Sequence, residues 1–346
     1  MPAPKSPYQP YASVHQKTNG PGDARPTALQ VVKDENAIGA HRGRVFLITG
    51  TSSGIGVETA RALYETGATL YLSARQIPKL EKVVDDIVAN GKLEGVPRPE
   101  ILEMHLDSLD SVRKAAEEFK GRSDRLDVLI CNAGVMAAPY STTQDKLETQ
   151  WGTNHAAHFL LFQLLKPLML ATAAKSGQDA RVVTTSSVGH RYGGVRLDDI
   201  NWEDGSYDKW KAYGQSKTSN IYMANAIDRR YGSKGLHATS AHPGGIMTEL
   251  TRHTSPDDWA RAGLDMEALA PVFKSPEQGA ATQTWAAIAK HFDGHGGVYL
   301  EDVGEAGAAT ETAASIAPGY AGYAYDEEAE EGLWKLSCKV VGVEED

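Results

Sequence analysis

The sequence has little of what defines several protein classes. Only two of its 346 residues are cysteines, Cys131 and Cys338, which lie far apart, so neither a disulfide framework nor a cysteine-based zinc site is expected. Basic residues are in the minority, with 35 Lys and Arg against 45 Asp and Glu, which argues against a nucleic-acid-binding protein. The chain does not open with a basic segment followed by an apolar stretch, so no secretory signal is expected.

Long hydrophobic runs are also missing. The most apolar stretch, residues 159–174, is interrupted by Gln163, Lys166 and Pro167 and falls short of the ~20 residues that span a bilayer. We therefore expect no membrane anchor. The low cysteine content favours a reducing compartment, and we expect a cytoplasmic protein.

Proline and charge are concentrated at the two ends of the chain. Six of the 16 prolines fall within the first 26 residues, which predicts an N-terminal extension over residues 1–43 that lies outside the fold, in part laid over its surface. Residues 326–346 hold eight acidic residues and two lysines, a net charge of −6. We predict an acidic C-terminal extension over residues 304–346, leaving 44–303 as one domain.

Short apolar strands alternate with helical patterns throughout residues 44–303. The nearly continuous apolar run at 45–49 is typical of a strand that is buried on both faces. Further strands are predicted at 69–73, 101–106, 128–131, 181–185, 236–241 and 297–300, and helices at 57–66, 80–90, 109–119, 151–173 and 213–231. This alternation predicts an α/β fold, a doubly wound parallel sheet of about seven strands with helices on both faces.

A glycine-rich turn follows the first strand and precedes a helix. It contains Gly50, Ser52, Ser53, Gly54, Ile55 and Gly56. Glycines allow a tight turn and let phosphate oxygens approach the backbone N–H groups at a helix N-terminus, where the helix dipole favours negative charge. In this position the turn favours dinucleotide binding over an ordinary tight turn.

The turn and several later motifs resemble those of the short-chain dehydrogenase/reductase family. The turn has the spacing G-x-x-x-G-x-G, and the later motifs are Cys131-Asn132-Ala133-Gly134, Asn154, Ser187, Tyr213-Gly214-Gln215-Ser216-Lys217, and Pro243-Gly244 with Thr248. The resemblance covers about residues 44–303. It implies a Rossmann fold and a nicotinamide dinucleotide bound by the turn together with Asn132, Ala133, Gly134, Tyr213, Lys217, Pro243, Gly244 and Thr248.

Two residues bear on which dinucleotide is bound. An NAD site usually places a carboxylate at the end of the second strand, but this sequence has Arg75 there, whose guanidinium can pair with a 2′-phosphate. NADP(H) is therefore expected over NAD(H), with a solvated arginine as the alternative. Asp107 holds the position that contacts adenine in the resembled family, although a surface turn would also suit an acid.

The predicted reactive centre lies on one helix and the strand before it. Tyr213 and Lys217 are four residues apart and share a helix face, so the ammonium is expected to lower the pKa of the phenol. The resemblance implies that Tyr213 is the general acid or base and that Lys217 holds the nicotinamide ribose. It also implies that Ser187, rather than its neighbour Ser186, binds the substrate oxygen, and that Asn154 completes a tetrad by positioning a water.

The substrate region is less sharply defined. Twenty-five residues separate Ser187 from Tyr213, and they include Tyr192, Trp202, Tyr207 and Trp210. This segment resembles the retinol-dehydrogenase-like and WW-domain-oxidoreductase-like branch, which implies an apolar alcohol or carbonyl substrate. The aromatic residues could instead pack a surface loop. A lid over the substrate is predicted at about residues 249–276.

The main prediction is thus an NADP(H)-dependent oxidoreductase that interconverts an alcohol and a carbonyl. The alternative is a non-catalytic dinucleotide sensor or scaffold that binds a partner through the acidic C-terminus. A homo-oligomer is possible in either case. Two histidine pairs, His155 with His158 and His291 with His295, lack further ligands in the sequence, so no metal site is predicted.

Overall fold

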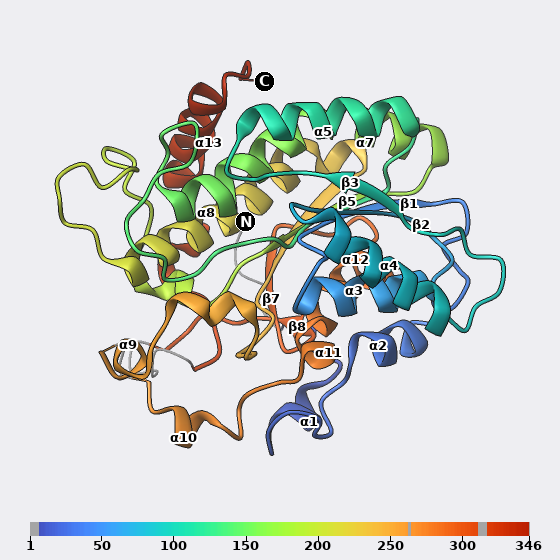
Figure 1. The fold of residues 1–346 in the computed structure, drawn as a ribbon, viewed down its shortest axis with the longest axis horizontal. Helices are drawn as coiled ribbons and strands as arrows, with labels where there is room; N and C mark the ends of the chain where they lie inside the picture. Colours follow the sequence, from blue (N-terminus) through green and yellow to red (C-terminus); the bar gives the residue numbers. More distant parts are fainter. Residues whose placement is uncertain (1–6, 262–263, 311–316, 346) are drawn as a thin grey trace.

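A computed structural model describes residues 7–261, 264–310 and 317–345 of the chain. Within them, one eight-stranded sheet has the order β3-β2-β1-β4-β5-β6-β7-β8 (Figure 1). The strands are β1 (Val45–Thr49), β2 (Thr69–Ala74), β3 (Glu100–Glu103), β4 (Val128–Cys131), β5 (Ala180–Thr185), β6 (Leu236–Ala241), β7 (Val298–Glu301) and β8 (Gly304–Glu305). Neighbouring strands are parallel except β7 and β8, which are antiparallel. The short β8 was not predicted from the sequence.

Helices cover both faces of this sheet (Figure 1). One face carries α2 (Ala28–Asp34), α3 (Ile55–Tyr64), α4 (Ile77–Asn90) and α12 (Ala281–Ile288), and the other carries α5 (Leu109–Arg122), α7 (Ala157–Ser176), α8 (Lys209–Tyr231) and α13 (Glu327–Val341). Shorter helices are α1 (Ala12–His15), α6 (Thr149–Trp151), α9 (Pro256–Arg261), α10 (Met266–Leu269) and α11 (Pro276–Gly279). The predicted doubly wound Rossmann fold is confirmed, with one strand more than the expected seven.

Strand β1 shows why the sequence reads as a continuous apolar run. Leu47 points into the hydrophobic core on the α5, α7 and α8 side, whereas Phe46 and Ile48 point into the core on the α3 and α12 side. All three are fully buried. Side chains alternate across a strand, so a strand that is covered on both faces needs apolar residues at every position.

The N-terminal segment is more closely joined to this fold than an extension outside it would be. Val31 and Val32 in α2 are fully buried against α3 and α12. Earlier in the chain, the Tyr8 carbonyl accepts a hydrogen bond from the Glu305 N–H, and the Gln9 side chain donates to the Glu305 carbonyl, so this segment lies along β8. Residues 1–6 of the predicted extension lie outside the described residues.

The described part of the acidic C-terminal segment also packs on the domain, whereas residues 311–316 and 346 of the predicted extension lie outside the described residues. Helix α13 buries Leu333 and Trp334 against α7 and α8. Its Glu330 forms ion pairs with Arg229, and Glu331 pairs with both Arg229 and Arg230. Composition alone indicated an acidic tail. Apolar residues at helical spacing, however, bury one face of α13 on the domain, so much of this segment is a packed helix.

The continuous helical stretch Thr149–Ser176 is long and apolar enough, by length and composition, to cross a membrane. In this fold 72% of its most apolar part is buried. The stretch includes α6, a π-helical turn at Gly152–Ala156, and α7, which contains Pro167. It serves as the central core helix beside the sheet.

Candidate active site

One cavity of about 930 Å³ opens at the carboxyl ends of the central strands. Every residue that the sequence predicted to bind the cofactor lines it: Gly50, Ser52, Ser53, Gly54, Ile55, Gly56, Arg75, Asp107, Asn132, Ala133, Gly134, Tyr213, Lys217, Pro243, Gly244 and Thr248. Of the four predicted catalytic residues, Ser187, Tyr213 and Lys217 line the cavity, and Asn154 lies behind its wall. The structure thus brings residues that lie far apart in the sequence into one site.

The glycine-rich turn packs against the end of β4. Gly50 has a φ of 72°, and a Cβ atom there would lie only 2.7 Å from the Cα of Ala133. A Cβ atom at Gly56 would collide with the carbonyl oxygen of Gly50 and with the Asn132 side chain. These glycines are required by close backbone approach, and they hold the N-terminus of α3 at the cavity.

Thr49 and Asn132 tie the turn to β4. The Thr49 hydroxyl oxygen accepts hydrogen bonds from the backbone N–H groups of Asn132 and Ala133, at 3.0 and 3.1 Å. The Asn132 side chain donates to the carbonyls of Thr49 and Gly50 and accepts from Gln283 in α12. Gln283 had no signal in the sequence, because its part in the site comes only from the packing of α12.

The end of β2 forms the rim of the cavity. Arg75 is exposed there. Nearby Lys79 pairs with Glu249 of the 249–276 segment at 2.7 Å. Asp107 also lines the cavity, and its Oδ1 atom is buried without a hydrogen-bond partner among the described residues. A buried carboxylate oxygen of this kind is suited to a ligand that brings a hydrogen-bond donor, such as an adenine amino group.

Tyr213 and Lys217 occupy successive turns of α8 at the wall of the cavity. The Lys217 ammonium lies 5.5 Å from the centre of the Tyr213 ring and donates a 2.9 Å hydrogen bond to the carbonyl of Thr185. Burial lowers the pKa of Lys217 to about 7, and it raises the pKa of Tyr213 to about 12 although a hydrogen bond to Ser187 acts in the opposite direction. The lowering expected from the Lys217 ammonium is therefore not found in the protein alone, where burial has the largest effect on the phenol and raises its pKa.

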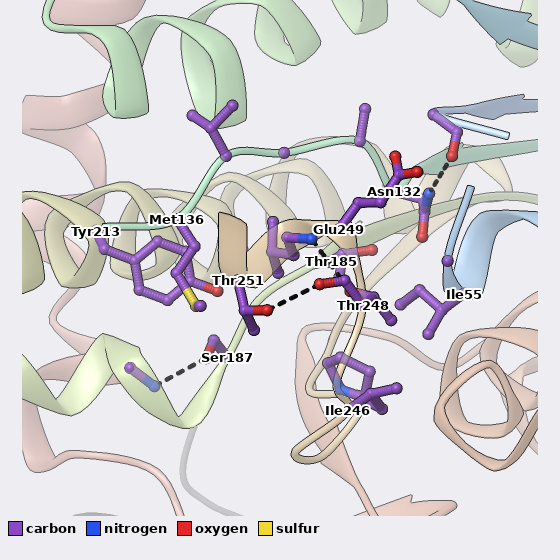
Figure 2. A pocket seen from close by; sticks show the side chains of 18 of the residues that line it. Ile55, Asn132, Met136, Thr185, Ser187, Tyr213, Ile246, Thr248, Glu249 and Thr251 are labelled. Atoms are coloured by element: carbon purple, nitrogen blue, oxygen red, sulfur yellow. Dashed lines mark hydrogen bonds between the residues drawn. The ribbon is translucent and has the colours of Figure 1, made fainter. Parts of the chain in front are cut away.

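Ser187 lies beside the Tyr213 phenol (Figure 2). Its hydroxyl oxygen accepts a 3.0 Å hydrogen bond from the Gly189 N–H, which fixes the side chain at the start of a short 3₁₀ turn. Neighbouring Ser186 is committed elsewhere, since its hydroxyl donates to the Lys217 carbonyl at 2.9 Å. The geometry places Ser187, and not Ser186, next to the phenol.

Asn154 lies in the π-helical turn that precedes α7. Its side chain accepts from the N–H of Val135 and donates to the carbonyl of Val135 and to the Ser216 hydroxyl. A Cβ atom at Gly134 would lie 3.0 Å from the Asn154 side-chain oxygen and 3.6 Å from the Lys217 ammonium nitrogen. Asn154 thus fixes the loop that follows β4 close to Lys217.

An apolar region adjoins the Tyr213 phenol. Met136 lies beside the ring (Figure 2) and forms a hydrophobic cluster with it, against which Trp210, Leu250 and Trp259 pack. The rings of Trp210 and Trp259 are 5.2 Å apart. Leu250 and Trp259 belong to the segment that was predicted as a lid, and both line the cavity. Residues 262–263 of that segment lie outside the described residues.

The N-terminal segment contributes residues that the sequence did not point to. Arg25 is buried, and its guanidinium donates to the carbonyls of Val272 and Phe273 in the 249–276 segment. Figure 1 shows the blue N-terminal segment with α1 close to the orange segment with α10. Lys274, which pairs with Asp302 at 2.7 Å, also lines the cavity beside Gly244.

Comparisons with known proteins agree with this architecture. The short chain dehydrogenase profile matches residues 44–259. Short-chain dehydrogenase/reductase prx1 of Penicillium roqueforti is 45% identical over 97% of this chain and 96% of its own length. Retinol dehydrogenase 12 of Mus musculus is 34% identical over 87% of each chain. A crystal structure of an uncharacterised protein from Mycobacterium paratuberculosis has 31% identity and a TM-score of 0.67, covering 93% of this chain and 99% of the other. The chain therefore belongs to the short-chain dehydrogenase/reductase family, in a branch with the retinol dehydrogenases, and is an oxidoreductase of that family.

Proposed function

We propose that this protein is an NADP(H)-dependent enzyme that interconverts an apolar alcohol and the corresponding carbonyl compound. The observation that carries the proposal is the grouping of Ser187, Tyr213 and Lys217 on one wall of a cavity whose opposite end is a glycine-rich helix N-terminus. A sensor or scaffold would need the helix N-terminus but would not need a group that transfers protons.

The cavity residues suit a nicotinamide dinucleotide. The turn from Gly50 to Gly56 offers backbone N–H groups to the pyrophosphate, and the unpartnered Asp107 oxygen offers an acceptor to the adenine. Arg75 offers a guanidinium to the 2′-phosphate, which is the reason for preferring NADP(H). When bound, the nicotinamide supplies or accepts the hydride.

The chain's own part in the reaction is to move one proton. For reduction, the Tyr213 O–H bond breaks and its proton goes to the substrate oxygen, which would balance the hydride that a bound nicotinamide would supply to the substrate carbon. For oxidation, the phenolate takes the proton back. Ser187 donates a hydrogen bond to the same oxygen, and Lys217 stabilises the phenolate when the lysine is protonated.

The walls next to Tyr213 favour an apolar substrate. Met136, Trp210, Leu250 and Trp259 present apolar surface there. A site of this kind gains affinity by burying apolar area and by stacking on aromatic rings. The 249–276 segment closes one side of this space, in keeping with a role in excluding water.

Substitution of Tyr213 tests the proposal. Purified wild type and Tyr213→Phe are assayed with NADPH on a panel of apolar aldehydes and ketones, and cofactor binding is measured by the fluorescence of NADPH. We expect kcat to fall by about 10²–10⁴-fold with NADPH affinity retained. Equal turnover by the two proteins would refute the proposed role of Tyr213, and tight NADPH binding without turnover by wild type would favour a sensor.

A further inference from the structure

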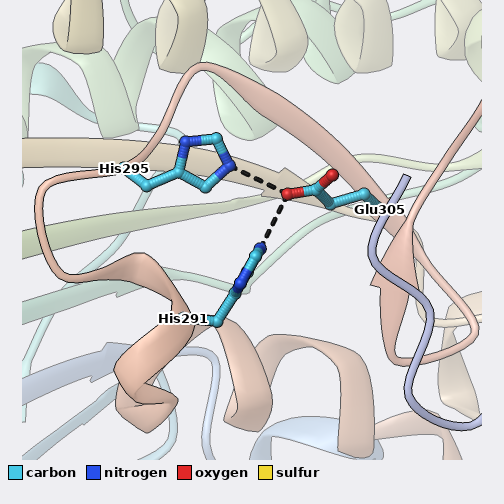
Figure 3. Close-up of side chains that lie close together, drawn as sticks. All are labelled: His291, His295 and Glu305. Atoms are coloured by element: carbon cyan, nitrogen blue, oxygen red, sulfur yellow. Dashed lines mark hydrogen bonds and ion pairs between the residues drawn. The ribbon is translucent and has the colours of Figure 1, made fainter. Parts of the chain in front are cut away.

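A second group of chemically active side chains lies outside the cavity, at the far edge of the sheet. His291 and His295 come from the connection between α12 and β7, and Glu305 comes from β8 (Figure 3). None of the three lines the cavity. We infer that these residues form a binding site for a divalent transition-metal ion of the Zn²⁺ type, which fastens the N-terminal segment to this edge.

The geometry already brings three ligand atoms together. The Nε2 atoms of His291 and His295 each lie 2.8 Å from the same carboxylate oxygen, Oε1 of Glu305. All three potential ligand atoms lie within 4.8 Å of one another. Ligand atoms around tetrahedral Zn²⁺, at bond lengths of about 2.0–2.1 Å, are roughly 3.3 Å apart. Binding would therefore open each N–O separation by about 0.5 Å and bring the two nitrogens, which lie within 4.8 Å of each other, to the same spacing.

The chemistry of the three ligands matches the ion. Two imidazole nitrogens and one carboxylate oxygen are one of the established donor sets for Zn²⁺ at sites with three protein ligands, where water takes the fourth position. An imidazole that carries its hydrogen on Nδ1 offers the Nε2 lone pair to the ion. His295 is 40% exposed, which gives the ion and a coordinating water access to the site.

The charge balance of Glu305 also points to a cation. This carboxylate is only 4% exposed. Among the described parts of the chain, its ion-pair partners are His291 and His295. A divalent ion bound between these side chains would compensate the charge of the buried carboxylate directly.

The surrounding packing holds the ligands in place. The His291 ring stacks on Tyr8 with 4.3 Å between the ring centres and lies parallel to Trp285 at 5.7 Å. The second oxygen of Glu305 accepts a 3.2 Å hydrogen bond from the Tyr8 N–H. Outer contacts of this kind orient metal ligands, and here they come from the N-terminal segment.

This arrangement predicts a structural effect rather than a catalytic one. Tyr8 touches one ligand through its ring and another through its backbone. An ion that fixes both ligands would therefore hold residues 8 and 9 against β8. The clearest local reporter is the Glu305 N–H, which donates to the Tyr8 carbonyl.

The test is a metal titration of the full chain. Chelator-treated protein is titrated with Zn²⁺ by calorimetry, and Co²⁺ is used in parallel because its visible absorption reports a low coordination number. We expect one ion per chain, slower hydrogen exchange at the Glu305 amide, and a rise in thermal midpoint of about 5 °C when the ion exceeds its Kd a hundredfold.

Two variants probe the ligands, and one serves as a control. His291→Gln and His295→Gln keep a hydrogen-bond donor for Glu305, and each is expected to weaken Zn²⁺ binding by at least about tenfold. His105→Gln is the matched control, because His105 pairs with Glu103 at 3.1 Å without a second histidine. The inference is overturned if wild type shows no saturable binding, if both ligand variants bind like wild type, or if His105→Gln weakens binding as much as they do.

Discussion

The Lys217 ammonium lies 5.5 Å from the centre of the Tyr213 ring and donates a hydrogen bond to the Thr185 carbonyl. Burial opposes charge on both groups, since it lowers the pKa of Lys217 to about 7 and raises the pKa of Tyr213 to about 12. Burial in the cavity therefore favours the uncharged form of each side chain. Perturbed groups of this kind cluster at functional sites.

The low pKa of Lys217 predicts a pH-dependent stability of the cofactor-free protein. Between pH 7 and about 10.5 the unfolded lysine binds a proton that the folded one has released, so this group makes the free energy of unfolding rise with pH. Below pH 7 the full cost of burying the ammonium remains. Lys217→Met does not carry this cost, so at pH 7 the variant is expected to have a higher free energy of unfolding than wild type. This difference is expected to shrink from pH 7 to pH 10, by at most about 4 kcal/mol.

Urea denaturation of both proteins across this pH range provides the measurement, with the difference between them isolating the lysine from all other titrating groups. A constant difference from pH 6 to pH 10 would show that the folded lysine keeps an ordinary pKa.

Arg75→Ala is expected to change the cofactor preference. Loss of a charge-assisted pair with the 2′-phosphate should weaken NADPH binding by about 10–100-fold, with little effect on NADH. Fluorescence titration with each cofactor measures this change. Arg98→Ala, which removes an exposed arginine paired with Asp85, is the matched control. An equal loss of affinity for both cofactors would mean that Arg75 does not read the phosphate.

Arg25→Ala is expected to loosen the 249–276 segment. The buried guanidinium pairs with Asp23 and donates to the carbonyls of Val272 and Phe273, and its removal takes the donor from both carbonyls and the ion-pair partner from Asp23. We expect the free energy of unfolding to fall by about 3 kcal/mol, with faster proteolysis within this segment. Arg42→Ala is a suitable comparison, because Arg42 also donates to two carbonyls but is exposed. Similar proteolysis of the two variants would argue against a clamp.

Trp334→Ala tests whether α13 is a structural part of the domain. Trp334 is 2% exposed and packs edge-on against Phe159 at 4.9 Å, with the Arg230 guanidinium 4.6 Å from its ring. Its truncation should lower the free energy of unfolding by about 3–5 kcal/mol while NADPH affinity is retained, because the helix lies away from the cavity. A loss below about 1 kcal/mol would indicate that α13 is only loosely attached.

Much of the sheet could be predicted from the sequence because its central buried strands, such as β1 and β4, are short and almost continuously apolar. Predicted strands 45–49, 128–131 and 236–241 agree with β1, β4 and β6 residue for residue. Strand β8 was missed since it is only two residues long and includes a glycine and a glutamate. Its place in the sheet depends on β7 and not on its own pattern.

The cavity residues could also be predicted, because motifs that follow parallel strands meet at one edge of the sheet. The sequence did not predict the roles of Arg25, Gln283 and Lys274, because these roles arise from contacts with segments far away in the sequence. The same limit applies to Glu305, whose proximity to His291 and His295 depends on the turn into β8. The pKa of Tyr213 was misjudged because burial cannot be weighed against a neighbouring charge without the structure.

The pairing of Tyr8 and Gln9 with Glu305 has a consequence for solubility. An open sheet exposes unpaired backbone groups along its outermost strands, and these can recruit strands from other molecules. Residues 8 and 9 cover the β8 margin, where the Glu305 amide is already bonded to Tyr8. The opposite margin, β3, is four residues long and bears exposed Glu100 and Glu103. Both ends of the sheet are therefore protected against the strand-by-strand growth that leads to aggregation, and the N-terminal segment provides that protection at one of them.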